Sequence, residues 1–339
     1  MVSYTFPSFE DLPKVSGTPQ GCVWGFYDRD GKKDEVGCDL SLAVNLLTEE
    51  VVLAAKEEIK IGRSIQLDWP LHNLEFPGFG RRKLEHKVID LTHSLNNCGF
   101  DDEIHVNTQC GSQWDSLKHV SKIGRRTESV SLMWLQYAYQ KDKVFYNGLK
   151  YEDALKSDTN GIHNVKTGAR EAVSFYEKRD GQAPDAWTTH QIPVADVKAA
   201  LSKQFTRPKQ GDILMLRTGY VRQHSQATAE QRKQGTCDRS TAIGLQANEE
   251  TIRWLYSQHF SAHVADSVAF EAWPPAPDND YIIHEWSLVW WGAPLGEMWN
   301  LEELAAECAR LKRWTFFLTS APLHVRGGVG SPPGAIAVF

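Results

Sequence analysis

At residues 109–119 the chain reads QCGSQWDSLKH. Four side chains of this stretch are able to bind a metal ion or a substrate: Gln109, Gln113, Asp115 and His119. The preceding residues, Glu103–Thr108, alternate in character as a half-buried strand does. We therefore expect a strand that leads into Gln109 and a turn through residues 110–112 that directs the chain toward a ligand.

The composition is that of a globular protein and argues against two kinds of partner. Of 339 residues, 41% are hydrophobic and 24% are charged, which is ordinary for a globular chain. A net charge of −6 and a pI of about 6.1 argue against a nucleic-acid partner, which requires a basic surface. No signal peptide is visible, and no apolar stretch approaches the roughly 18 residues that span a bilayer. Scattered cysteines without a C-x-x-C pair fit a reduced compartment, so a cytoplasmic protein without a membrane partner is expected.

Helix and strand patterns are mixed along the chain without strict alternation. Residues 1–45 are rich in Gly, Pro and Asp and predict an N-terminal arm, followed by one domain over residues 46–339. The predicted helices are 48–61, 131–140, 194–201, 249–258, 282–291 and 301–311. The predicted strands are 64–69, 87–91, 103–108, 211–217, 261–265, 314–320 and 335–339, with a hairpin turn at Asn147-Gly148. These patterns predict an α/β fold, a single domain with a mixed, barrel-like β core flanked by helices.

Spacing alone leaves ordinary structural roles open for the residues of the opening stretch. Asp115 and His119 are four residues apart, which is also typical of a surface helix pair or of a loop histidine bonded to the backbone. Gln109 and Gln113 are equally suited to satisfying backbone groups at a strand end. A catalytic divalent ion needs three or four ligands and an open position, so these residues need partners from elsewhere in the chain.

Several longer segments resemble the cyclase family, the kynurenine formamidase-like metal-dependent hydrolases. The family signature is His-x-Gly-Thr-His-x-Asp-x-x-x-His, and the run Ser-Gln-Trp-Asp resembles its fungal branch, with Gln in place of two motif histidines. The resemblance covers about residues 20–339 and implies a swivelling β/β/α fold and a homodimer or higher homo-oligomer. The matching segments are Gln109–His119, Gly211–Tyr220, Ala262–Trp273, His284–Trp286 and Gly296–Met298, flanked by Asn45–Thr48 and Thr319–Leu323.

The resemblance implies that one of two metal positions keeps its ligands. In bacterial members the first position uses two motif histidines and the aspartate, and the histidines correspond to Gln109 and Gln113. The second position uses the aspartate, the last motif histidine, a distant histidine and a distant glutamate. Its counterparts are all present: Asp115, His119, His284 and Glu297.

The retained set implies a single divalent ion, Mn²⁺, Zn²⁺ or Mg²⁺. An amide oxygen is a poor replacement for imidazole at zinc and suits harder ions better. Without the resemblance, His284 is better read as a core residue of an apolar helix, and Glu297 as a carboxylate in the first turn of a helix.

The implied function is hydrolysis of a small amide, lactam or lactone, with an aromatic substrate as one option. The ion would polarise the carbonyl and acidify a water molecule. His119 would be either a ligand or the general base, and Gln109 and Gln113 would hydrogen-bond the carbonyl or the water. One alternative is a non-hydrolytic cyclase, lyase or isomerase of secondary metabolism, in which these three side chains act as hydrogen-bond and proton-transfer groups. The other is a non-catalytic small-molecule binder, which the retained ligand set counts against.

Overall fold

A buried five-stranded sheet lies at the centre of the protein, whose computed structural model describes residues 5–28, 34, 46–92, 98–122, 143–162, 167–169, 183–276 and 279–339. Its strand order is β12 (Gly330–Ser331), β4 (Gln113–Asp115), β10 (Leu295–Glu297), β9 (Ala262–Ala265) and β7 (Ile213–Leu216). Strand β4 runs antiparallel to both neighbours, whereas β10, β9 and β7 are parallel to one another. Nearly every residue of this sheet is buried, so both of its faces are covered.

The other described strands form three further open sheets. A four-stranded antiparallel sheet has the order β1 (Ser64–Gln66), β13 (Ala335–Val338), β11 (Phe317–Ser320) and β5 (Thr167–Ala169). Strand β2 (Glu85–Asp90) pairs with β3 (Phe100–His105), and β6 (Gln191–Ile192) with β8 (Gly244–Leu245). The predicted mixed α/β fold is confirmed. The barrel-like core needs correction, because no pairing among the described strands closes either large sheet.

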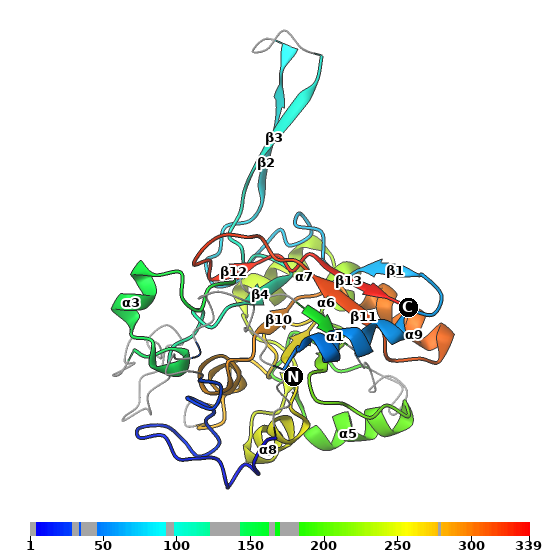
Figure 1. Ribbon diagram of the computed structural model, residues 1–339. Coiled ribbons are helices and arrows are strands. Elements are labelled where there is room, and N and C mark those ends of the chain that lie inside the picture. Colours follow the sequence, from blue (N-terminus) through cyan, green and yellow to red (C-terminus); the bar gives the residue numbers. More distant parts are fainter. Residues whose placement is uncertain are drawn as a thin grey trace.

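Helices surround the two large sheets (Figure 1). The first one begins as the sequence predicts, because Thr48 Oγ1 accepts the N–H of Val51 and two acidic residues occupy the first turn. The described helices are α1 (Glu49–Ala55), η1 (Lys56–Glu58), η4 (Tyr146–Gly148), α3 (Tyr151–Lys156), α5 (Val194–Lys203), α6 (Tyr220–Gln226), α7 (Ala229–Lys233), η6 (Gln234–Asp238), α8 (Glu249–Gln258), η7 (Glu285–Trp291) and α9 (Glu302–Leu311). Among these helices, none has the length and apolar character that a membrane crossing requires.

Two tryptophans fasten the central sheet to its surroundings. Trp114 and Trp299 are completely buried, and their ring centroids lie 4.9 Å apart in an edge-to-face arrangement. Trp114 Nε1 donates to Ser320 Oγ at 2.9 Å, which joins β4 to β11 of the second sheet. Trp299 Nε1 donates to the carbonyl of Gln113 at 3.0 Å. Strand β4 is therefore held by side-chain bonds as well as by its two strand neighbours.

Most of the predicted elements are present with shifted ends. The predicted strands at 64–69, 211–217, 261–265, 314–320 and 335–339 correspond to β1, β7, β9, β11 and β13. The hairpin turn is present as well, with positive φ angles of 52° at Asn147 and 82° at Gly148. The predicted helix at 131–140 lies outside the described residues.

The described part of the N-terminal arm packs on the body of the protein. Leu12, Val23 and Tyr27 belong to the same hydrophobic core as the central sheet. Trp24 Nε1 donates to the carbonyl of Val289 at 2.6 Å. The division between arm and domain at residue 45 falls in a stretch outside the described residues and stays a prediction.

A two-stranded hairpin projects from the body and corrects one prediction (Figure 1). The half-buried strand expected at 103–108 is β3, which spans Phe100–His105, and all of its residues are exposed. Among the described strands it pairs with β2 alone, and its exposed residues show that the ribbon stands away from the core. Three residues separate its end from Gln109, and they lead the chain back to the body.

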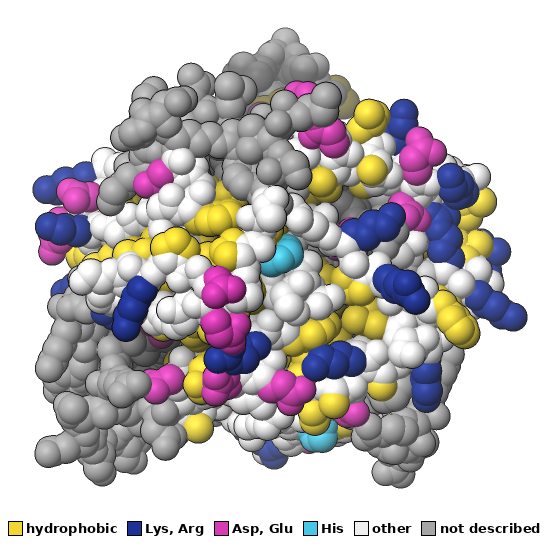
Figure 2. Space-filling model, turned by 60° about the horizontal axis from the view of Figure 1, so that its bottom comes forward, with side chains coloured by type: hydrophobic (Ala, Val, Ile, Leu, Met, Phe, Trp, Pro, Cys, Tyr) yellow, Lys and Arg dark blue, Asp and Glu magenta, His cyan; other side chains and the backbone are white. Residues whose placement is uncertain are grey.

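The surface face drawn in Figure 2 mixes side chains of both charges. Lys and Arg lie among Asp and Glu, with hydrophobic side chains between them. Exposed charged side chains can form ion pairs, such as Arg63–Glu303 at 2.7 Å. Individually, such pairs contribute little to stability.

His224 makes the stability of the fold sensitive to acid. This side chain is 1% exposed, packs edge-on against Trp69, and its Nε2 has no hydrogen-bond partner among the described residues. Burial lowers its pKa from 6.5 to about 4. The pKa of His224 is lower in the folded protein than in the unfolded chain. Its contribution to the unfolding free energy is therefore complete above pH 6.5 and is lost as the pH falls toward about 4.

His224→Phe keeps a ring against Trp69 but has no titrating group. As the pH is lowered from 7 to 5, we expect its unfolding free energy to rise by about 1–2 kcal/mol relative to that of wild type. Urea titrations at several pH values measure this difference. Replacement of the exposed His72 by Phe is the control and should track wild type. If the unfolding free energies of wild type and His224→Phe changed in parallel with pH, the claim that His224 is buried and neutral would be wrong.

Candidate metal centre

The candidate site lies on one face of the paired strands β4 and β10. In this antiparallel pair Gln113 lies opposite Glu297, and Asp115 lies opposite Leu295. Side chains alternate along a strand, so Gln113, Asp115 and Glu297 point to the same side of the sheet. Their exposed fractions are 0%, 0% and 2%. The pairing therefore buries two carboxylates and an amide together.

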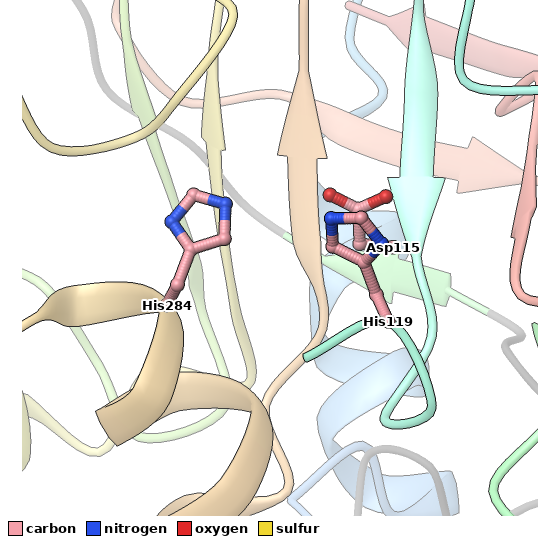
Figure 3. Close-up of side chains that lie close together, drawn as sticks. All are labelled: Asp115, His119 and His284. Carbon is pink, nitrogen blue, oxygen red and sulfur yellow. The ribbon is translucent and has the colours of Figure 1, made fainter. Parts of the chain in front are cut away.

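Two histidines complete the cluster from different segments (Figure 3). His119 follows β4 in a turn, in which its backbone N–H donates to the carbonyl of Ser116 at 3.0 Å. His284 lies at the N-terminal end of η7, across the cluster from β4. One ligand atom from each of Asp115, His119 and His284 lies within 4.8 Å of the other two. Ligand atoms around a zinc ion are about 4 Å apart or less, so this spacing is close to that of a metal site.

Glu297 joins the cluster through a contact that lacks hydrogen-bond geometry. Its Oε1 lies 2.9 Å from His284 Nε2, yet this oxygen has no hydrogen-bond partner among the described residues. Gln113 Oε1 is also buried without a donor. Buried acceptors are nearly always satisfied, so the unsatisfied Oε1 of Glu297, beside a cluster of possible ligands, fits a cation as its partner.

The two glutamines bind the carboxylates through their amide N–H groups. Gln109 Nε2 donates to Asp115 Oδ1 at 2.6 Å and to His119 Nδ1 at 2.8 Å. Gln113 Nε2 donates to Glu297 Oε2 at 2.7 Å and to Asp115 Oδ2 at 3.2 Å. Amide donors from both glutamines therefore lie against the Asp115 carboxylate.

Burial and neighbouring charges shift three pKa values in the cluster. Burial and the Asp115 carboxylate raise the pKa of Glu297 to about 7, against the attraction of His284. Burial lowers the pKa of His119 to about 4, so this imidazole is neutral at pH 7. Burial alone would lower the pKa of His284, but Glu271 and Glu297 hold it well above 6.5. A cation would have to displace protons from this cluster.

The structure brings together all the site residues that the sequence predicts. Asp115 ends a strand and His119 is half-buried in a turn, so the two do not form a surface helix pair. Glu297 ends β10, not the first turn of a helix. The individual roles in ligation and catalysis stay predictions for the six residues: Gln109, Gln113, Asp115, His119, His284 and Glu297.

Two charged residues beside the site lie outside the set of site residues predicted from the sequence. Arg81 Nη1 donates to the carbonyl of Gln109 at 2.7 Å, and its guanidinium lies 5.1 Å from the ring centroid of Phe79. Glu271, completely buried, accepts two hydrogen bonds from His284. Neither residue lies at a distance along the chain from residues 109–119 that is typical of metal ligands, so the motif does not identify them.

Comparison with known proteins gives a family and a fold. A family model described as a putative cyclase matches residues 89–272. A solved structure described as a novel cyclase is 27% identical, with a TM-score of 0.74, and the alignment covers 94% of this chain and 99% of that one. No curated protein matches the sequence.

Isatin hydrolases share the fold at lower identity. Isatin hydrolase A from Ralstonia solanacearum is 15% identical, with a TM-score of 0.53 and coverage of 86% of this chain and 98% of that one. An isatin hydrolase bound to the product analogue thioisatinate is also 15% identical, with a TM-score of 0.55 and coverage of 86% and 99%. At this identity the likeness shows the single-domain α/β fold alone.

In protein stripped of metal by a chelator, we expect a carboxyl group that titrates near pH 7, because Glu297 is buried beside Asp115. Infrared difference spectra across a pH series measure the protonated carboxyl. The signal should be absent from Glu297→Gln and retained in Glu302→Gln, which changes a carboxylate paired with Arg217.

The same shift has a consequence for stability. The folded pKa of Glu297 lies above its ordinary value of 4.5, so its contribution to the unfolding free energy is complete below pH 4.5 and is lost as the pH rises through about 7.

For the infrared measurement, a spectrum without any carboxyl titrating above pH 6 would contradict the burial of two acids in one cluster.

Proposed function

The chain belongs to the cyclase family, and from that premise we propose that it is a metal-dependent hydrolase that opens a small amide, lactam or lactone. Family membership, predicted from the motifs of the sequence, is confirmed by the family model. The placement in a fungal branch is not tested and stays a prediction. Hydrolysis is supported by the chemistry of the cluster around Asp115 and His284.

The observation that carries the proposal is the convergence of four ligands from distant segments. Asp115, His119, His284 and Glu297 offer two carboxylates and two imidazoles, a mixed oxygen and nitrogen set that suits Mn²⁺ or Zn²⁺. Two buried carboxylates also match the charge of one divalent ion. The unsatisfied Oε1 of Glu297 supports the same assignment.

When bound, a divalent ion supplies Lewis acidity toward a carbonyl and acidifies a water molecule. His119 enters the reaction as a neutral imidazole, because burial lowers its pKa to about 4. The amide of Gln109 bonds His119 Nδ1 and Asp115 Oδ1 and so fixes the two side chains relative to each other. Arg81, which donates to the carbonyl of Gln109, brings a positive charge to the site that acts to lower the pKa of Glu297.

Purified protein is expected to bind about one equivalent of Mn²⁺ or Zn²⁺ and to hydrolyse at least one member of a panel of amides, lactams and lactones. Elemental analysis after dialysis and product detection measure the two properties. Asp115→Asn and His284→Ala should lose both, because each removes a ligand. Glu303→Gln, at an exposed ion pair, is the matched control and should keep both.

Two outcomes would count against the proposal in different ways. A protein that takes up no ion under any loading condition would not be a metal-dependent hydrolase. An ion without turnover of the panel would favour the non-hydrolytic cyclase, lyase or isomerase of secondary metabolism. His119→Gln separates the roles of that residue, since ion loss indicates a ligand, and ion retention with lost turnover indicates a proton carrier.

Exchanging both glutamines for histidine tests whether a second ion position was lost. The double variant Gln109→His, Gln113→His is expected to raise the ion content from about one to about two equivalents, because imidazole lone pairs replace amide donors beside Asp115. Elemental analysis measures the change, and Gln191→His, on the exposed side of β6, is the control. A double variant that stays at one equivalent would show that the two amides do not stand where an ion binds.

We also propose a small-molecule substrate and a homodimer. The substrate proposal rests on the burial and small size of the cluster, and the homodimer rests on resemblance alone. Light scattering of the purified protein measures the oligomeric state directly.

A further inference from the structure

Glu271 lies behind His284 and binds it at two points. It is completely buried in the segment that follows β9. Its Oε1 accepts the backbone N–H of His284 at 3.0 Å, and its Oε2 accepts from His284 Nδ1 at 2.7 Å. One carboxylate therefore fixes both the backbone and the ring of the same histidine.

These two bonds decide which ring nitrogen faces the cluster. With Nδ1 directed to Glu271, the other nitrogen, Nε2, points away from Glu271 and lies 2.9 Å from Glu297 Oε1. Only one orientation of the imidazole allows both contacts, since the two nitrogens stand on opposite sides of the ring. A ring rotated away from Glu271 would direct a carbon atom or Nδ1 at the cluster.

The backbone under Glu271 is itself held on both sides. Leu245 N–H donates to the carbonyl of Phe270 at 2.9 Å, and the N–H of Ala272 donates to the carbonyl of Leu245 at 3.0 Å. Gly244 lies so close that a Cβ there would come within 2.2 Å of the carbonyl carbon of Glu271. Only glycine permits this approach, so β8 and the segment of Glu271 form a rigid support.

Burying a carboxylate is costly unless hydrogen bonds compensate, and both bonds observed for the Glu271 side chain come from His284. Histidines that bind metal ions commonly donate their second ring N–H to a carboxylate, which fixes tautomer and orientation. The arrangement of Glu271 and His284 is of this kind.

We propose that Glu271 is a positioning residue for the ion, because it holds His284 with Nε2 directed at the cluster. The inference rests on the proposed metal-dependent function, but it concerns a residue outside the ligand set. Glu271 does not touch the ion. It acts through His284 by fixing the ring before an ion arrives, which removes a conformational cost from binding.

Glu271→Gln tests this role with nearly unchanged side-chain volume. A glutamine oxygen accepts only one of the two bonds, and its NH2 group meets the other N–H of His284, so the ring loses its fixed orientation. We expect Co²⁺ to bind the variant about 10–100-fold more weakly than wild type, as measured by competition with a chromogenic chelator. The visible absorption spectrum of bound Co²⁺ should also change, because the ligand geometry changes.

Asp266→Asn is the matched control. Asp266 is also completely buried and lies in the same segment, but it accepts from Thr218 and Gly219 instead of a site residue. Its loss should lower stability while leaving Co²⁺ affinity and spectrum as in wild type. A purely structural role for Glu271 predicts the same result for both variants.

The outcomes separate the inference from the function on which it rests. Wild-type Co²⁺ affinity and spectrum in Glu271→Gln would overturn the inference alone. A wild-type protein that binds no Co²⁺ would overturn both. If Glu271→Gln does not fold, nitrogen NMR of Zn²⁺-loaded wild type, with His284→Ala for assignment, still decides: the inference requires a proton on Nδ1 and none on Nε2, and the reverse would overturn it.

Discussion

The site depends on the antiparallel pairing of β4 with β10. This pairing places Gln113 opposite Glu297 and puts Asp115 on the same face, so two carboxylates share one buried space. A shift of one residue in register would turn Glu297 to the other face of the sheet. Buried acids that are not compensated are costly, and here amide N–H groups and the imidazole of His284 lie against the two carboxylates.

The sequence predicted which side chains meet at the candidate site better than it predicted the strands that carry them. The stretch 109–119 itself contains four residues of types that bind ions or substrates. The distant His284 and Glu297 follow from resemblance to the family. Helices with clear caps were also predictable, as at Thr48 and Asn248, whose side chains accept from the first turn. The buried strand β7 is a continuous apolar run, which composition alone indicates.

The rest depends on contacts that a pattern in the chain does not contain. Strands β4 and β10 are three residues long, too short for an alternation of side chains to be recognised. The alternation predicted at 103–108 overlaps β3 only at its last three residues, and this ribbon leaves the body, so its exposure was not predictable from alternation. The partner of His284 is Glu271, and only the fold brings the two carboxylate oxygens to its ring and backbone.

The distance along the chain between β4 and β10 also sets an order of events during synthesis. Gln113 and Glu297 are 184 residues apart. At a translation rate of about 5–20 residues per second, β4 emerges from the ribosome roughly 10–40 s before β10. During that interval Trp114 has no Trp299 to pack against, and its strand has no partner on that side. Nascent chains therefore expose an unpaired strand next to an aromatic side chain, a state that favours aggregation.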